Sequence, residues 1–536
     1  MKRDINPFGD ADAARVSFDP SNFVEFTGRR FRGGLAMRPD DGEVRVIVGG
    51  KGAGKTIYLR RLQTGLSRDR SRYVDDWRNR PPATRHVLEV WGWSASVPDC
   101  RQRWSRLWRR AIMRSVVSHL LHGRFNAKPL SAGIPEGVVT RLRRDFPELL
   151  PTFEERSSIV TQVEAIIQEH ADREALDAFL DNPRWEVLEL QIIDALEDLP
   201  PVFFILDALD EEFESAPSQW LDCQVGLLKQ VFELRSNQRF GSNLHVIIGV
   251  RDLVYSTTQH SEHSTRFHRT AGIRYLKWDR DAIQYFLHAK LRQLDEDEWM
   301  LDRRASDPVE RWLGHRLIWN PRRQREELLE DYILRHTRLI PRDVIQMGNA
   351  LCDCINEVVD STELSLHQDA LRRTVAEVSR EAGMEQLYIV ANHITADLMP
   401  REALKHDFAD SFIDLGQAIA DGAPDEVGSA HQGSVLDSLR GALGELGEDR
   451  ITAGRLNTLV PKLGILSQAD ILSILWQHRL LGYVDGKDRL HDPVVFYGVT
   501  QDDSLELPAG KKYYALHSIL IDAVDGLRGV GATVQL

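Results

Sequence analysis

The chain contains 536 residues, and its 68 lysines and arginines against 81 acidic residues give a net charge of −13. The length suggests about three domains, and the negative balance excludes a global electrostatic attraction to nucleic acid. No apolar run approaches the roughly 18 residues of a membrane span, the first residues lack the hydrophobic core of a signal peptide, and four cysteines are too few for a disulfide framework, so we expect a cytoplasmic protein with no membrane segment.

Residues 1–35 are expected to form an N-terminal arm, because they are polar, rich in glycine and precede the first predicted strand. Such an arm can fold over the ligand pocket that the next segment predicts, or it can be an ordinary surface loop. The pattern leaves both interpretations open.

The segment Val44–Thr56 carries the strongest chemical signal of the chain. A β-branched run leads into Gly49-x-x-x-x-Gly54-Lys55-Thr56, the P-loop pattern that binds nucleotide phosphates. The glycines let backbone N–H groups turn toward phosphate oxygens, the lysine reaches the β- and γ-phosphates, and the threonine hydroxyl ligates Mg²⁺. The helix that starts here adds the positive end of its dipole. The expected nucleotide-binding residues are Gly49, Gly50, Lys51, Gly52, Ala53, Gly54, Lys55, Thr56 and Ile57.

The segment after this helix predicts a second strand at 86–91, which follows an arginine-dense linker at 68–85. A helix at about 101–122 then places tryptophans and aliphatic residues at spacings of three and four, with five arginines between them. Such a helix can contact nucleic acid, but we favour a helix that packs its tryptophan face on the sheet and leaves a solvated basic face. Residues of about 125–180 predict an α-helical insertion.

Residues 202–206 form an uninterrupted apolar run, typical of a central parallel strand that is covered on both faces. The run ends at Asp207, where the carboxyl end of the strand meets a ligand crevice. We expect Asp207 to hold Mg²⁺ through water, as a Walker B acid does, and Asp210 or Glu211 to orient or deprotonate the attacking water. An acidic cluster after a strand is also typical of a helix N-terminus.

Two further strands are expected at 244–250 and 273–277. Arg251 follows the first of them and is our candidate for a residue that senses the γ-phosphate; a salt bridge to the acidic cluster after residue 207 is the alternative. Arg266 or Arg269, just ahead of the second strand, is a candidate finger for the site of a neighbouring subunit.

The pattern becomes helical after residue 279, and we expect a helical lid over 291–360. Pro341 suits the first position of a helix, so the next residue, Arg342, is expected to face the nucleotide. A first-turn arginine opposes the helix dipole, which predicts a compensating partner.

Residues 361–440 are expected to be helical and to contain a linker at 421–434, and 441–536 to form a winged-helix-like domain with a two-stranded ribbon. The expected recognition helix, 468–481, has few cations for reading DNA. A protein-contact or autoinhibitory role is therefore favoured for this domain.

These motifs resemble those of P-loop ATPases that insert an extra strand beside the P-loop strand, and among them the STAND and KAP-type signalling ATPases. The resemblance rests on Gly49–Thr56, Asp207–Glu211, Arg251 and Pro341-Arg342, and it covers about residues 20–360. It implies an α/β core with a parallel five-stranded sheet in the order 5-1-4-3-2, followed by a lid and a winged helix.

The resemblance places that ATPase core at 36–290. Ala208 stands where the family often has Gly or Asp, and no C-terminal repeat array follows the winged helix, which implies that a protein partner or self-assembly supplies the sensing half of the switch. Members of this group are often prokaryotic defence or regulatory switches, and this role comes from analogy alone.

Together these observations predict an ATP-binding and ATP-hydrolysing switch that needs Mg²⁺. Nucleotide would clamp the lid through Lys55, Arg251 and Arg342, and hydrolysis would release it. The alternative is a nucleic-acid-dependent ATPase that uses the arginine-rich helices and the winged helix; a third possibility is a scaffold that holds nucleotide without turnover. Adenine is favoured because no guanine-reading Asn-Lys-x-Asp motif occurs where one would be expected.

Overall fold

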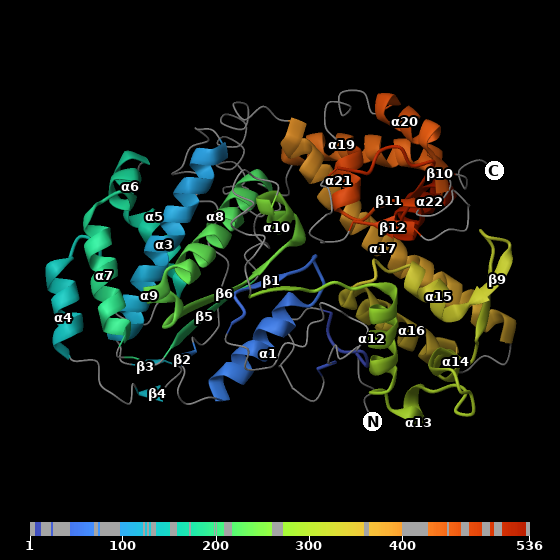
Figure 1. The fold of residues 1–536 in the computed structure, drawn as a ribbon. Helices are drawn as coiled ribbons and strands as arrows, with labels where there is room; N and C mark the ends of the chain where they lie inside the picture. Colours follow the sequence, from blue (N-terminus) through green and yellow to red (C-terminus); the bar gives the residue numbers. More distant parts are fainter. Residues whose placement is uncertain are drawn as a thin grey trace.

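The computed structural model combines a parallel sheet, a lid and a tail domain, so the chain belongs to the mixed α/β class, as expected (Figure 1). It describes residues 6–11, 23–24, 43–68, 73–74, 97–121, 124–125, 128–129, 136–150, 158–170, 173–197, 199, 201–207, 217–259, 272–358, 364–398, 427–446, 450–462, 471–484, 494–497 and 506–531. Among these residues, no helix is both long and apolar enough to cross a bilayer.

The central sheet has the strand order β2-β5-β6-β1-β7, and each neighbouring pair is parallel. The strands are β1 (Val46–Val48), β2 (Tyr73–Val74), β5 (Val202–Leu206), β6 (Leu244–Val250) and β7 (Ile273–Tyr275). The edge strand β2, which pairs with β5, therefore lies within residues 68–85, the stretch that we expected to be a linker. The expected strand at 86–91 lies outside the described residues. Local propensity did not identify β2 because only two of its residues pair with β5.

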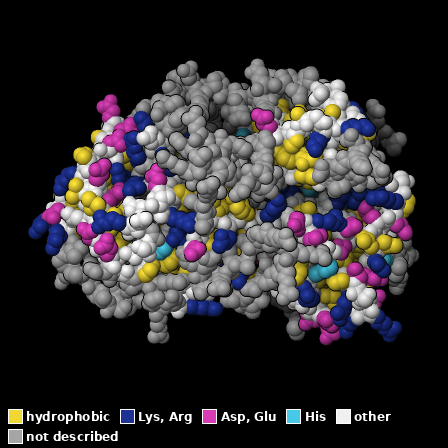
Figure 2. Space-filling view, in the orientation of Figure 1, with side chains coloured by type: hydrophobic (Ala, Val, Ile, Leu, Met, Phe, Trp, Pro, Cys, Tyr) yellow, Lys and Arg dark blue, Asp and Glu magenta, His cyan; other side chains and the backbone are white. Residues whose placement is uncertain are grey.

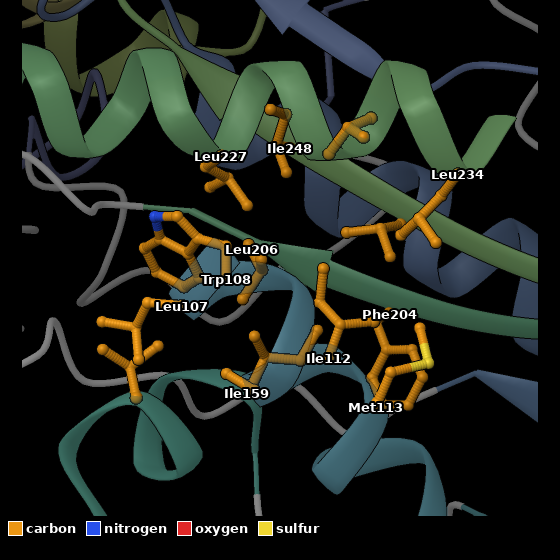
Figure 3. Packing of buried hydrophobic residues seen from close by; sticks show 14 of the residues in the cluster. Leu107, Trp108, Ile112, Met113, Ile159, Phe204, Leu206, Leu227, Leu234 and Ile248 are labelled. Atoms are coloured by element: carbon orange, nitrogen blue, oxygen red, sulfur yellow. The ribbon is translucent and has the colours of Figure 1, made fainter. Parts of the chain in front are cut away.

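Alternate residues of each strand enter two separate cores, as the pleat of a strand requires. Val46, Phe204 and Ile248 face a core with helices α3 (Val97–Leu121) and α8 (Pro217–Ser236). The other face packs on α1 (Lys55–Arg68), the helix that leaves β1. Figure 3 shows Trp108 and Ile112 of α3 against strand β5 and α8. The sheet is thus covered on both sides, which explains why its central strands are apolar except at His245 of β6.

Within the described residues, the expected insertion at about 125–180 contains three helices, and a fourth follows it; together they cover the outer side of α3 (Figure 1). These helices, and the short elements that flank them and the sheet, are α4 (Glu136–Asp145), α5 (Ile159–Glu169), α6 (Arg173–Leu180), α7 (Arg184–Glu197), β3 (Arg124–Phe125), β4 (Lys128–Pro129), α9 (Gln238–Gly241) and α10 (Asp252–Gln259). α3 is consequently buried between the sheet and the insertion, and its tryptophans Trp104 and Trp108 are fully enclosed.

The lid is a helical layer around a core of its own. Its elements are α12 (Arg280–Leu291), α13 (Glu296–Trp299), α14 (Pro308–Leu313), β8 (Leu317–Asn320), β9 (Arg325–Leu328), α15 (Leu329–Arg335) and α16 (Pro341–Val358). Local signals define α14 well, since Asp307 caps its N-terminus, Pro308 opens it and Gly314 ends it with a positive φ. The antiparallel hairpin β8–β9 was not anticipated from the sequence.

The tail combines an antiparallel sheet, in the order β10-β13-β11-β12, with surrounding helices. Its elements are α17 (Leu364–Leu398), α19 (Val427–Leu446), β10 (Arg450–Thr452), α20 (Ala453–Lys462), α21 (Ile471–Gln477), β11 (Leu481–Val484), β12 (Val494–Phe496), β13 (Tyr513–Leu516) and α22 (Ser518–Gly531). The sheet has four strands where we expected a ribbon of two.

Helix α17 joins the lid to the tail, because Leu371 lies in the lid core and Leu387 lies in the tail core. The expected linker at 421–434 overlaps the start of α19, and the expected boundary at residue 440 falls inside that helix. α19 contributes Leu439 and Leu443 to the tail core, so the helix belongs with the tail. The glycines and serines at the start of this helix are typical of a linker, which is why the sequence favoured one there.

Candidate functional site

The loop between β1 and α1 has the backbone shape that its glycines predict. Gly52 and Gly54 adopt φ values of +81° and +92°, a region that other residues rarely occupy. The Gly49 N–H donates to Val250 O (3.2 Å), which fixes the start of the loop to the end of β6. The Lys55 ammonium curls back and donates to the carbonyl oxygens of Gly49 (3.0 Å) and Gly50 (3.1 Å). The lysine is therefore held over the loop, next to the N-terminus of α1.

Thr56 and Asp207, which are 151 residues apart in the chain, meet at the bottom of this loop. The Thr56 hydroxyl donates to Asp207 Oδ2, and Asp207 is almost completely buried at the end of β5. Gly249 on the neighbouring strand makes room for this carboxylate, because a Cβ there would lie 2.7 Å from Asp207 Oδ1. The parallel pairing of β5 with β6 thus positions the acid beside the glycine loop.

The oxygen donors at this point fit a magnesium ion better than a softer metal. A threonine hydroxyl and one carboxylate are the protein ligands that Mg²⁺ commonly uses when phosphate oxygens and water complete its octahedron. No group of three or more His, Cys, Asp or Glu side chains suited to a metal occurs within the described part of the chain. Thr56 and Asp207 are therefore the residues that would hold such an ion.

Several predicted site residues lie outside the described part of the chain. These are Asp210, Glu211, Arg266 and Arg269. Arg251 is described, and it lies directly after β6, beside Asp252, which begins α10. Arg251 and Asp207 therefore both follow the carboxyl ends of parallel strands, at the same edge of the sheet.

The lid covers the glycine loop from one side. The Arg342 N–H donates to Gly52 O (3.3 Å), and a Cβ at Gly52 would lie 2.9 Å from both Arg342 Cβ and Ile340 Cδ1. Trp278, which the sequence did not single out, donates its indole N–H to Ala53 O (2.9 Å). Among the residues that the structure describes, the Arg342 guanidinium has no hydrogen-bonding or ionic partner, so the expected compensating partner is not found there.

A buried ion pair holds the turn that presents Arg342. Arg338 makes a bidentate pair with Asp343, with its Nη2 2.7 Å from Oδ1 and its Nε 2.9 Å from Oδ2. Burial by itself would raise the pKa of the Asp343 carboxyl, but the guanidinium outweighs this effect and holds the pKa below its usual value. The first turn of α16 is thus fixed in position above the loop.

The tail covers the loop from a second side, which the sequence did not reveal. Arg479, just after α21, lies 3.2 Å from Asp252 through its Nη2, and its guanidinium carbon lies 3.8 Å from the position of a Cβ at Gly50. Lys51 in the loop forms an ion pair with Glu385 of α17 (3.2 Å). Both contacts join residues more than 200 positions apart, so composition and spacing alone carried no signal for them.

Arg479 also has an unusual backbone conformation. Its φ of +60° lies in the left-handed region, at the C-terminus of α21, where glycine is the ordinary residue. A side chain there costs about 1 kcal/mol. In the sequence, this position could have been recognised as the end of a helix that lacks a glycine and is followed by Leu480-Leu481, where the next strand begins.

His478 lies beside Arg479 and is part of the same contact. Its Nε2 is 3.2 Å from Nδ1 of His393 on α17. Burial, together with the nearby His393, Arg251 and Arg338, lowers the pKa of His478 well below its ordinary value. The imidazole is therefore neutral at pH 7 in this arrangement.

The arginines of α3 do not form the solvated basic face that we expected, because they pair with carboxylates. Arg109 and Arg110 share Glu189 of α7 at 2.6–2.8 Å. The other pairs include Arg101 with Asp222, Arg103 with Asp177, Arg106 with Asp181 and Arg114 with Glu169. Basic and acidic side chains are likewise interspersed over the face in Figure 2. These cations stabilise the insertion and are not presented as a nucleic-acid surface.

Comparisons with known proteins identify no family for this chain: no family model matches it, and no curated protein is significantly similar. The assignment of a function thus depends on the geometry described above.

Proposed function

We propose that this protein is a Mg²⁺-dependent, ATP-binding and ATP-hydrolysing switch. The observation that carries the proposal is the hydrogen bond between Thr56 and Asp207 beneath the glycine loop. A glycine loop, a lysine and a threonine at a helix N-terminus, with an acid at the end of a strand that one inserted strand separates from the loop's own strand, are the parts that the P-loop ATPases of the stated resemblance use. The strand order β2-β5-β6-β1-β7 supports this interpretation. When the five strands are numbered 1 to 5 along the chain and counted from the β7 edge, the order is 5-1-4-3-2.

The chain's own residues would act chiefly by positioning and by charge neutralisation. The loop N–H groups and the N-terminus of α1 would bind the β-phosphate, and Lys55 would leave the two loop carbonyls to contact the β- and γ-phosphates. Mg²⁺ held by Thr56 and Asp207 would neutralise charge on the same phosphates. Asp210 or Glu211 remains the candidate for orienting water.

The lid and the tail would respond to the nucleotide because both contact the loop. Arg342 would meet the γ-phosphate from the lid, and Arg251 would meet it from the end of β6; the closeness of Arg342 to Gly52 and the position of Arg251 directly after the strand support these roles. Phosphate charge would compete for Arg479 with Asp252, and for Lys51 with Glu385. We therefore propose that nucleotide binding loosens the tail, whose four-stranded sheet and helices we assign as a winged-helix variant used for protein contact or autoinhibition.

The decisive experiment measures MgATP affinity and phosphate release for the full chain and for Lys55→Ala. Loss of the ammonium should weaken MgATP binding by about 10- to 150-fold, since a charge-assisted contact contributes about 1.5–3 kcal/mol. Asp207→Asn should retain nucleotide without Mg²⁺ but lose the Mg²⁺ enhancement. Lys229→Ala, at a half-exposed position on α8, is the matched control. MgATP binding by Lys55→Ala that equals that of the unmodified protein would refute the proposal.

The nucleic-acid alternative makes a different prediction. A DNA-stimulated ATPase would show turnover that rises with DNA and a binding constant that falls steeply with salt. We expect neither, because the α3 arginines pair with carboxylates and Arg479 faces the loop.

A further inference from the structure

The lid contains a pocket for a short turn that the chain itself supplies. Residues 6–9 form a β-turn closed by the Gly9 N–H and Asn6 O (2.8 Å), with proline at its second position. Phe8 projects from this turn into the lid core, where it is fully buried and its ring centroid lies 5.1 Å from that of Trp312. The first described residues of the expected arm therefore pack on the lid.

Asn349 of α16 recognises the main chain of this turn. Its Oδ1 accepts from the Phe8 N–H (2.9 Å), and its Nδ2 donates to Gly9 O (2.9 Å). One side-chain amide thus satisfies a donor and an acceptor of adjacent residues, which fixes both the direction and the register of the bound segment.

Two glycines make the fit specific. A Cβ at Gly348 would lie 2.4 Å from the Phe8 ring, so the helix can accept an aromatic side chain only without a side chain at that position. Gly9 has a φ of +94°, which other residues rarely adopt. The pocket therefore selects a Pro-Phe-Gly turn by shape, by backbone conformation and by hydrogen bonding.

We propose that this pocket is a recognition site for a Phe-bearing turn, and that a second copy of this chain can deliver residues 6–9 into it. The turn is closed by its own hydrogen bond, so it needs no neighbouring element to keep its shape. Further along the same segment, Phe23 packs on Tyr58 of α1. Eleven residues of the sequence separate Ala11 from Phe23, and a chain of that length spans at most about 40 Å.

Every chain carries both halves of this contact, so exchange would be reciprocal between two copies. In the closed protein the tethered segment has an effective concentration of the order of millimolar, and the intramolecular contact is expected to dominate. The proposal does not depend on nucleotide binding or hydrolysis.

The first test uses a Phe8→Ala chain, whose pocket is vacated, and a fluorescent peptide of residues 5–12. Saturable binding with a dissociation constant between about 1 µM and 1 mM is expected for one aromatic anchor and two hydrogen bonds. A peptide carrying Phe8→Ala should not bind, and Asn349→Ala in the protein should weaken binding about tenfold. Phe8→Leu, which retains part of the buried area, is measured in parallel and should bind the peptide more weakly. The proposal would be overturned if folded Phe8→Ala and Phe8→Leu chains both showed no saturable peptide binding, or if Asn349→Ala left the affinity for the peptide unchanged.

The second test mixes two complementary variants of the full chain. Phe8→Ala has an intact pocket and no anchor, whereas Gly348→Leu has a blocked pocket and a released anchor; Asn349→Ala replaces Gly348→Leu if the latter is misfolded. Light scattering above the measured peptide dissociation constant should show a two-chain species in the mixture that neither variant forms alone. A mixture that keeps the single-chain mass would show that the segment acts only within its own molecule and would refute exchange.

Discussion

Replacing Arg479 with glycine should raise the basal rate of ATP hydrolysis about tenfold, if the tail restrains the loop as proposed. The guanidinium bridges the tail to Asp252 at 3.2 Å, and the two side chains are only 19% and 11% exposed. The substitution removes this bridge while keeping the left-handed helix end, because glycine adopts the φ of +60° without strain. It therefore separates the contact from the stability of the tail.

The expected magnitude follows from the geometry of the pair. A charge-assisted hydrogen bond contributes about 1.5–3 kcal/mol, and partial solvent exposure places this one at the lower end. Relief of left-handed strain, about 1 kcal/mol, occurs whether or not the tail is docked and so leaves that equilibrium unchanged. A loss of about 1.5 kcal/mol from the docked state corresponds to roughly a tenfold shift toward the undocked state.

The assay is steady-state phosphate release at saturating MgATP, with thermal unfolding measured on the same samples. Arg373→Ala, on the exposed side of α17, is the control for loss of an arginine and should leave the rate unchanged. Asp252→Asn should also accelerate release. A folded Arg479→Gly protein with an unchanged rate would refute the reasoning, and a slower rate would refute it and would instead make Arg479 a contributor to catalysis.

Three further predictions concern the positions that support the site. Gly249→Ala should weaken MgATP binding and lower the unfolding free energy by about 1–3 kcal/mol, because the new methyl group would lie 2.7 Å from Asp207 Oδ1; calorimetry in both titration and scanning modes measures the two effects. Burial lowers the pKa of His517 to about 3, so the stability it contributes is complete above its ordinary pKa of 6.5 and is lost as the pH falls from there toward 3, by at most about 1.4 kcal/mol per pH unit; denaturant titrations of His517→Asn should show a shallower pH dependence between those values. Asp343→Ala should cost about 3–5 kcal/mol by leaving Arg338 buried without its partner, and an unfolding midpoint within about 2 °C of the unmodified protein would contradict this.

Part of the fold could be anticipated because its signals are local. The apolar runs at β5 and β6 were predicted at nearly the observed bounds, since a strand buried on both faces needs apolar residues throughout. The strand β2 and the hairpin β8–β9 were missed, because each is short and owes its pairing to the element beside it. The start of α19 was assigned to a linker at 421–434, because its glycines and serines are typical of loops but are tolerated in a helix that packs on α17 and α22.

The residues of the candidate site likewise fall into those that the sequence could predict and those that it could not. The sequence by itself determined the glycine loop, Lys55, Thr56 and the acid at the end of β5, because backbone conformation and strand burial restrict which residues occur there. Only the tertiary structure decided that Arg479 covers Gly50 and that Phe8 enters the lid, because each contact joins segments hundreds of residues apart, and their meeting depends on how whole helices pack rather than on any local pattern.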